Sequence, residues 1–273
     1  MDEYYLTDIY IYPIKSLGGI RLEHAEVEEK GLKYDRQWML IDRDGTFVSQ
    51  RKHHQLSLLQ VGIENSLISI THKLDPGIQT SFDCESETGQ VIPVTVWDDS
   101  CMGMEVSTAV NTWFSSLLEM DVRLVKMLPA ELRLVDPKYA KANEVVRFSD
   151  GYPFLIIGQA SLDKLNDLLD QKIRMDRFRP NFVFSGGEAH QEDSFASFRI
   201  GEITFSAVKP CARCVLITVD QQSGKKGAEP LKTLASYRTR NNKIMFGQNL
   251  IHCGYGSVHV GDAIQLLSTK MPV

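Results

Sequence analysis

The most informative stretch of the chain is Val208-Lys-Pro-Cys-Ala-Arg-Cys-Val-Leu-Ile-Thr-Val-Asp220. It places Cys211 and Cys214 close together, with a lysine before the pair and an arginine inside it. Thiols beside fixed positive charge ionise more readily, and the thiolate is the form that attacks or binds a metal. The apolar, β-branched run over residues 215–219 predicts a buried strand, so we expect Cys214 where a loop enters the core.

The cysteine pair admits three interpretations. A zinc half-site needs two further ligands, and the only nearby candidates are the adjacent residues His252-Cys253. A thioredoxin-like redox pair should open a helix, whereas the residues after Cys214 predict a strand. The third interpretation is a pair of buried structural cysteines.

The composition excludes several classes of protein. The chain has 273 residues, of which 43% are hydrophobic and 24% charged, and its net charge of −5 gives no basic footprint for nucleic acid. The uncharged runs 106–118 and 151–162 are shorter than the roughly 20 apolar residues that cross a bilayer, and the acidic amino terminus is unlike a signal peptide. Five cysteines, an odd number, favour a reducing compartment. We therefore expect a cytoplasmic protein with neither nucleic acid nor membrane as a partner.

The patterning predicts a mainly β protein with a few helices. We expect a β-barrel domain over residues 1–125 and a larger, barrel-like β domain over residues 126–273. Asp44-Gly45 is the strongest hairpin signal in the chain, and Trp97-Asp98-Asp99 predicts a turn. The predicted strands are 5–12, 20–28, 36–43, 46–50, 56–61, 67–72, 91–96, 182–185, 203–208, 215–219 and two within 258–267.

Helical periodicity is confined to a few segments. Ser107 can cap a helix whose apolar face ends near residue 118, and Pro230 suits the start of a short helix. A further helix is predicted over 160–171. The stretch 128–150 has no period and is interpreted as a linker or as a loop lining a cleft.

Basic and polar residues recur beside turn residues. Each arginine alone is most simply a solvated surface charge, but several of them on an acidic chain indicate a bound anionic cofactor. Asp150, before an apolar run, is either a cap or turn former or a group that delivers protons beside a metal. Phe246-Gly-Gln-Asn249 could hydrogen-bond a heterocycle. The candidate anion-binding residues are Lys15, Ser16, Arg36, Arg51, Arg179 and Asn181.

Taken in order, these segments resemble the MOSC family, the molybdenum-cofactor sulfurase carboxy-terminal domain family, preceded by its amino-terminal β-barrel domain. The resemblance covers nearly the whole chain, and the order of the motifs makes it specific. The sequence is similar in particular to the bacterial N-hydroxylated-base reductases and to the mitochondrial amidoxime-reducing component. The motifs are Tyr12-Pro-Ile-Lys-Ser16, Tyr34-Asp-Arg-Gln-Trp38, Phe178-Arg-Pro-Asn181, Lys209-Pro-Cys-Ala-Arg-Cys214, Glu229-Pro-Leu-Lys-Thr-Leu-Ala-Ser-Tyr-Arg238 and Phe246-Gly-Gln-Asn249.

The resemblance implies a molybdenum–molybdopterin cofactor whose metal is held by Cys214. Asp150 matches an acidic residue near the metal and is the candidate proton relay, so the predicted catalytic residues are Cys214 and Asp150. The implied reaction is the reduction of N-hydroxylated compounds, with a role in detoxification. The residues that match the family's pterin and phosphate contacts are Lys15, Ser16, Arg36, Arg51, Arg179, Asn181 and Arg213.

One departure bears on the partners. Some bacterial relatives carry an iron–sulfur domain after the MOSC domain, and this sequence has no cysteine after Cys253. We therefore expect electrons from a separate protein of the iron–sulfur or flavin reductase type. The alternative is a carrier of the molybdenum cofactor, or of a persulfide on Cys214, without reductase turnover. A structural or interaction protein with buried cysteines is the third possibility.

Overall fold

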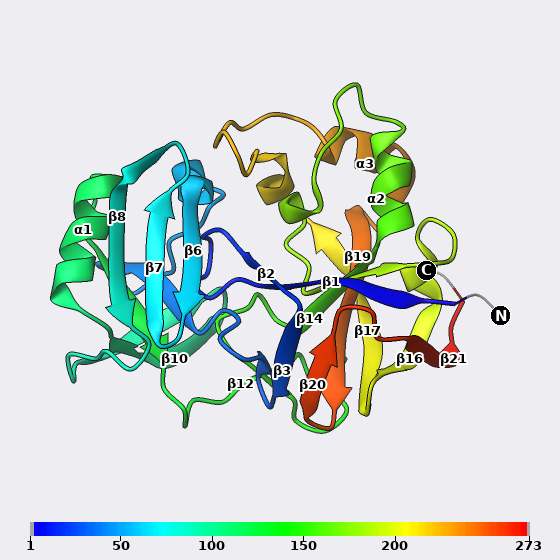
Figure 1. The fold of residues 1–273 in the computed structure, drawn as a ribbon, viewed down its shortest axis with the longest axis horizontal. Helices are drawn as coiled ribbons and strands as arrows, with labels where there is room; N and C mark the ends of the chain where they lie inside the picture. The colour runs from blue at the N-terminus through cyan, green and yellow to red at the C-terminus, as the bar shows by residue number, and fades with distance from the viewer. Residues whose placement is uncertain (1–2, 272–273) are drawn as a thin grey trace.

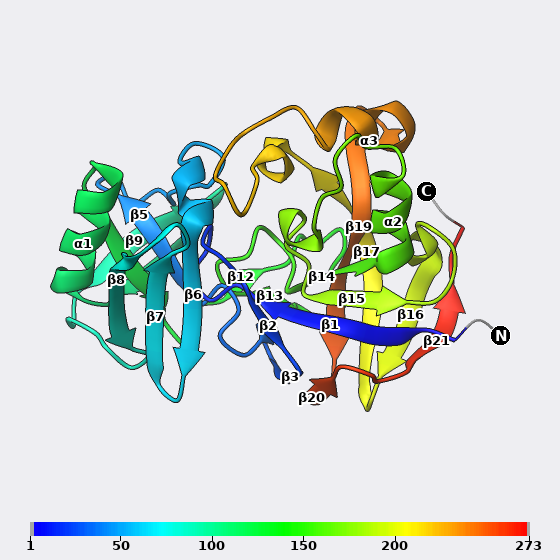
Figure 2. The ribbon, with the colours of Figure 1, turned by 45° about the horizontal axis from the view of Figure 1, so that its top comes forward.

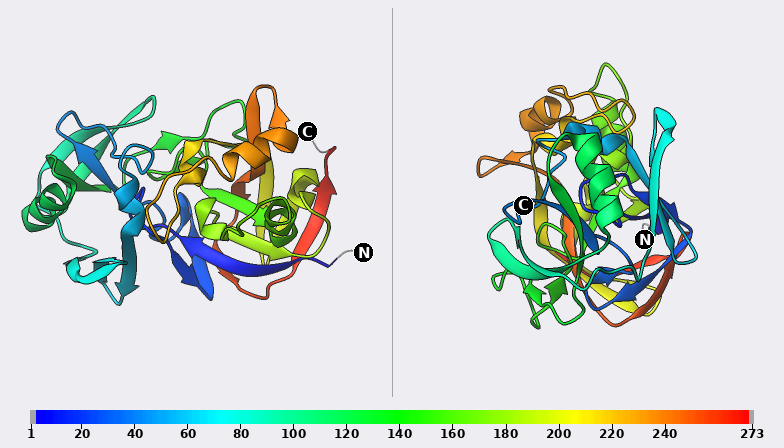
Figure 3. Two further views of the ribbon diagram at one scale, coloured as in Figure 1. Left: turned by 90° about the horizontal axis from the view of Figure 1, so that it is seen from above. Right: turned by 90° about the vertical axis from the view of Figure 1, so that its left-hand side faces the viewer.

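The computed structural model describes residues 3–271 and shows a mostly β protein (Figure 1). Strands make up 45% of the structure, and the described residues contain three α-helices. Two parts lie side by side along the long axis of the molecule, as the view from above also shows (Figure 3). The predicted fold class is confirmed.

The part that contains the carboxy terminus is built on a curled nine-stranded sheet (Figure 2). Its pairings are antiparallel, except that β14 and β15 run parallel. The order is β2-β1-β15-β14-β19-β17-β16-β21, with β18 beside β19. The bounds are β1 (Tyr5–Ile11), β2 (Ile20–Leu22), β14 (Phe154–Gly158), β15 (Phe182–Ser185), β16 (Phe195–Ile200), β17 (Ile203–Arg213), β18 (Thr239–Arg240), β19 (Lys243–Cys253) and β21 (Ile264–Thr269).

The other part holds a four-stranded sheet, β5-β11-β10-β9, and a three-stranded sheet, β6-β7-β8. A second three-stranded sheet, β20-β3-β4, and the pair β12-β13 complete the strands. The bounds are β3 (His24–Glu28), β4 (Gly31–Leu32), β5 (Trp38–Asp42), β6 (Leu59–Glu64), β7 (Leu67–His72), β8 (Asp75–Asp83), β9 (Val91–Val96), β10 (Asp99–Glu105), β11 (Val122–Met127), β12 (Arg133–Leu134), β13 (Val145–Val146) and β20 (Gly256–His259).

The start of the chain joins the part of the molecule that contains the carboxy terminus, not the part that holds the four-stranded sheet. β1 pairs with β15, and β3 pairs with β20. Leu6, Ile9 and Val27 are accordingly buried in the same core as Phe182 and Phe205. The division at residue 125 stays a prediction, and strand pairing shows that the opening segment crosses it.

The three α-helices follow local sequence signals. Ser107 caps α1 (Thr108–Leu118) by accepting a hydrogen bond from the backbone N–H of Val110, as predicted. α3 (Leu231–Arg238) begins directly after Pro230. α2 (Gln159–Asn166) is shorter than the predicted helix 160–171, because the Asn166 side chain binds both backbone groups of Ile173 and turns the chain back.

The predicted strand over residues 215–219 is wrong. β17 ends at Arg213, and a 3-10 helix, η4 (Val215–Thr218), follows Cys214. Arg213 already pairs with Ile244, next to the first residue of β19, so β19 offers no further residues for a longer strand to pair with. Cys214 therefore lies where a strand leaves the sheet, and Val215 is exposed rather than buried.

The hairpin predicted at Asp44-Gly45 is only half formed. Gly45 takes the positive φ that this turn needs, and its backbone N–H donates to the carbonyl of Asp42. The second arm makes single bridges, from Phe47 to Ile41 and from Thr46 to Thr95, and is not a strand. Among residues 3–271, no helix is long and apolar enough to span a membrane.

A polar network is buried behind β19. The carboxylate of Glu192 accepts hydrogen bonds from the hydroxyl of Ser161, and Arg238 and Gln248 both donate to the carboxylate of Asp193. Burial raises the pKa of Glu192 to about 7. Burial also lowers the pKa of the nearby His190 to about 4.

Substituting Glu192→Gln is expected to change how stability depends on pH. The wild-type carboxyl makes the fold less stable as pH rises from 4.5 to about 7, because the unfolded chain releases this proton first. His190 acts in the opposite sense between about 4 and 6.5, because the unfolded chain binds its proton more readily.

In the Gln variant, only His190 of these two groups still makes the free energy of unfolding depend on pH. Its free energy of unfolding should rise more steeply with pH than that of the wild type, by on the order of 3 kcal/mol over this window. Urea unfolding at both ends of the window measures the difference. Parallel pH curves for the two proteins would contradict it.

Candidate functional site

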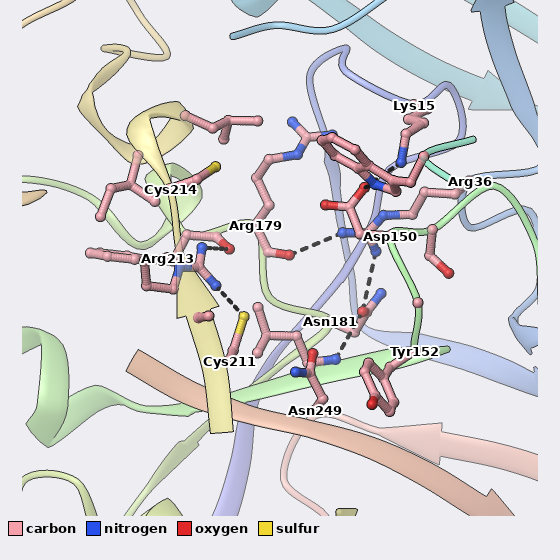
Figure 4. Close-up of a pocket in the computed structure, with 18 of the residues that line it drawn as sticks. Lys15, Arg36, Asp150, Tyr152, Arg179, Asn181, Cys211, Arg213, Cys214 and Asn249 are labelled. Atoms are coloured by element: carbon pink, nitrogen blue, oxygen red, sulfur yellow. Dashed lines mark hydrogen bonds and ion pairs between the residues drawn. The ribbon is translucent and has the colours of Figure 1, made fainter. Parts of the chain in front are cut away.

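A cavity of about 300 Å³ lies between the two parts of the molecule. Figure 4 shows Cys211 and Cys214 on one side of it, Lys15 and Arg36 on the other, and Arg179 between them. Its lining includes all the residues predicted as catalytic or as contacts of the molybdenum cofactor, namely Lys15, Ser16, Arg36, Arg51, Asp150, Arg179, Asn181, Arg213 and Cys214. The structure brings them all together, while their individual roles stay predictions.

Cys214 reaches the cavity because β17 ends just before it. The Cys214 residue is exposed, whereas Cys211 is half-buried within the strand. The guanidinium of Arg213 donates to the sulfur of Cys211 at 3.0 Å and to the carbonyl of Phe178 at 2.6 Å. These two contacts fix Arg213 at the sulfur side of the pocket.

Lys15 and Asp150 form an ion pair at the opposite side. The Lys15 ammonium donates to Asp150 at 2.5 Å and to the carbonyl of Phe148 at 2.8 Å. The indole N–H of Trp97 donates to the same carboxylate oxygen at 3.0 Å. The Asp150 side chain is 75% exposed because it opens onto the cavity. The protein atoms around the carboxylate displace water, which disfavours its charged form. The attraction and the hydrogen bond of Lys15 outweigh this desolvation and hold the pKa of Asp150 well below its ordinary value.

A second cluster joins segments that are far apart in sequence. Arg36 donates to the side-chain oxygen of Asn181 at 3.2 Å and to the carbonyl of Arg179 at 3.1 Å. Its ion pair with Asp35 fixes it further, at 2.6 Å. The guanidinium groups of Arg36 and Arg179 lie 4.4 and 4.1 Å from the ring centre of Tyr12. The Tyr12 ring attracts both guanidinium groups, which offsets part of the repulsion between the two charges.

Four residues around the pocket hold an unfavourable backbone conformation. The φ angles are 74° for Ser16, 48° for Arg36, 59° for Trp97 and 54° for Arg179. Such conformations are uncommon for residues other than glycine and cost about 1–3 kcal/mol each. They concentrate at functional sites, where the surrounding structure maintains them.

The charge of the pocket is opposite to that of the protein. The described lining residues contain six cations, Lys15, Arg36, Arg51, Arg179, Lys209 and Arg213, against the single carboxylate Asp150. The net charge of the whole chain is −5. Burial lowers the pKa of Arg179 to about 10, and this side chain donates to a carbonyl oxygen, that of Leu17. A pocket of this kind fits an anionic ligand.

The zinc interpretation of the cysteine pair fails on strand register. Thr204 pairs with Cys253, while Arg213 pairs with Ile244 at the other end of the same two strands. The two cysteine sites are therefore separated by about 30 Å along the sheet. No group of three or more potential metal-binding His, Cys, Asp and Glu residues occurs within residues 3–271.

The aromatic residues of the pocket were not predicted from the sequence. Phe47, Trp97 and Tyr152 line it, and Tyr12 supports it from behind. Trp97 was predicted only as part of a turn, which it is. Tyr12 is the first residue of the first family motif, which could have indicated its place at the site. No sequence pattern indicates that Phe47 lines the pocket.

These features define a class of protein: a two-part β fold with a cationic pocket between the parts and an exposed thiol at one side of it. The MOSC N-terminal beta barrel domain matches residues 3–121, and the MOSC domain matches residues 143–265. The chain belongs to the MOSC family.

Two kinds of relative are similar over most of this chain. Mitochondrial amidoxime-reducing component 1 is 31% identical in Mus musculus and 30% in Homo sapiens, in both cases over 280 residues that span 96% of this chain and 82% of the relative. The molybdenum cofactor sulfurase of Oryza sativa subsp. japonica is 32% identical over 275 residues, which span 90% of this chain and 32% of the sulfurase.

Proposed function

We propose that this protein binds a molybdenum–molybdopterin cofactor in the cationic pocket and reduces N-hydroxylated compounds such as hydroxylamines, N-hydroxylated bases and amidoximes. The observation that carries the proposal is the shared cavity, which combines the exposed Cys214 with six cations. Relatives named for amidoxime reduction and for the molybdenum cofactor support it.

The residues fit this cofactor by chemistry. Cys214 would supply a soft thiolate ligand to molybdenum. The guanidinium groups of Arg36, Arg51, Arg179 and Arg213 would bind the phosphate and the pterin, together with Lys15, Ser16 and Asn181. When bound, the cofactor would supply the two electrons that, with two protons, convert an N-hydroxyl group into N–H and water.

The chain's own residues would orient the substrate. Because Lys15 keeps Asp150 ionised, that carboxylate is an acceptor for an N–H or O–H group in the pocket. The predicted role of Asp150 as proton relay stays a proposal, and its low pKa favours taking up a proton only briefly. Phe47 and Tyr152 contribute apolar walls that limit water near the reacting group.

We propose that electrons come from a separate protein of the iron–sulfur or flavin type. The relatives are named as a component of amidoxime reduction, which supports a system of several proteins. A cytoplasmic location is supported by the cysteines, since Cys84, Cys101, Cys211, Cys214 and Cys253 are all free.

Turnover tests the proposal. Protein from a molybdenum-replete host, supplied with a chemical reductant, should convert an amidoxime into its amidine. Sulfane sulfur on Cys214, or exchangeable cofactor, without turnover would favour the carrier alternative instead. If the protein shows no turnover and also carries no transferable sulfur or cofactor, the interpretation as a structural or interaction protein is the one that remains.

A further inference from the structure

Trp97 occupies a position that disfavours its own side chain. It is the first residue of the two-residue turn between β9 and β10, where Val96 pairs with Asp99. Its φ of 59° suits glycine, asparagine or aspartate, and for a bulky aromatic residue it is an outlier. Since local propensity argues against tryptophan here, the contacts of the residue must hold it in this conformation.

Contacts fix the indole ring at the pocket. Its N–H donates to Asp150 at 3.0 Å, and the guanidinium carbon of Arg51 lies 3.9 Å from the ring centre. Phe47 packs nearly edge-on, with ring centres 4.8 Å apart. The Arg51 guanidinium covers one face of the ring, but Trp97 remains 41% exposed and lines the cavity, so part of the indole stays open to a ligand.

We propose that Trp97 is a specificity-determining residue, against which the flat ring of an aromatic N-hydroxylated substrate stacks. The inference rests on the proposed function, which supplies the N-hydroxyl group of the ligand. Stacking favours a planar aromatic ring, and an aliphatic chain gains much less from an indole surface. The Asp150 carboxylate, bonded to the edge of the same indole, can accept a hydrogen bond from the substrate's N–H or O–H group.

Calorimetric titration with an aromatic amidoxime and an aliphatic amidoxime tests the inference without electron transfer. Trp97→Asn removes the ring, and asparagine suits this turn, so the variant should fold. It is expected to bind the aromatic ligand about tenfold more weakly and the aliphatic one within about threefold of the wild type. Trp97→Phe keeps a ring and loses the N–H, and it should retain most of the aromatic preference.

Trp113→Leu is the matched control, because Trp113 lies on α1 outside the pocket lining. It should leave both affinities unchanged. Equal weakening for both ligands in Trp97→Asn, no weakening for either, or no binding of either ligand to the wild type would overturn the inference. Wild-type binding with the expected selectivity but without turnover would count against the proposed reductase function instead.

Discussion

Replacing Cys214 with serine is expected to reduce the molybdenum content of the purified protein to background and turnover by at least about 100-fold. The reason is ligand chemistry, since a thiolate is a soft ligand and a serine hydroxyl is neither soft nor ionised at neutral pH. Cys214 is exposed, so the substitution creates no cavity in the core, and the variant should fold. Metal analysis and an amidoxime reduction assay measure both effects.

Cys211→Ser is the matched control for this variant. Cys211 lies in the same stretch and accepts a hydrogen bond from Arg213, which a serine oxygen can accept equally. Molybdenum content and turnover should stay within about twofold of the wild type, because this sulfur is not the proposed ligand. Loss of metal in Cys211→Ser with retention in Cys214→Ser would show that the ligand assignment is reversed.

Lys15→Met is expected to damage both stability and cofactor retention. The variant leaves the buried carbonyl of Phe148 without its donor and removes the counter-ion of Asp150, which should lower the free energy of unfolding by about 1–3 kcal/mol. The half-exposed ion pair itself adds little, so most of the loss comes from the buried carbonyl. Removing one pocket cation should also lower the bound molybdenum at least about fivefold.

Lys33→Met provides the comparison, because Lys33 pairs with Glu26 at 2.9 Å on the exposed surface. It should change the free energy of unfolding by less than about 0.5 kcal/mol and leave the metal content alone. Urea unfolding measures the free energy of unfolding of both variants, and metal analysis measures their bound molybdenum. If the two lysine variants behave alike, Lys15 has no special place in the site.

The sequence predicted those elements whose signals are local. β7 and β9 have the predicted bounds, and the Ser107 cap is present, because alternation and capping depend on a few neighbouring residues. β19 was missed because polar residues interrupt it, and these serve opposite faces: Gln248 joins the buried network, while Asn249 faces the pocket. Its place in the sheet depends on partners distant in sequence.

The residues of the site also divide into those with a signal in the sequence and those that depend on contacts distant in sequence. Motifs shared with a family identified the cationic residues that the fold assembles, although no short pattern joins Arg36 to Asn181 across the chain. The error at residues 215–219 arose because an apolar run does not reveal whether a neighbouring strand continues beside it. The role of Trp97 depends on its φ angle and on contacts with Asp150 and Arg51, which sequence patterns do not contain.

The metal content of the wild-type protein, purified from a molybdenum-replete host and measured for molybdenum and zinc together, tests the central claim most directly. We expect about one molybdenum atom per chain and little zinc, because the pocket offers one exposed cysteine and a cationic cradle rather than a cluster of protein ligands. Zinc in place of molybdenum, or neither metal, would contradict the claim that this pocket holds the molybdenum cofactor.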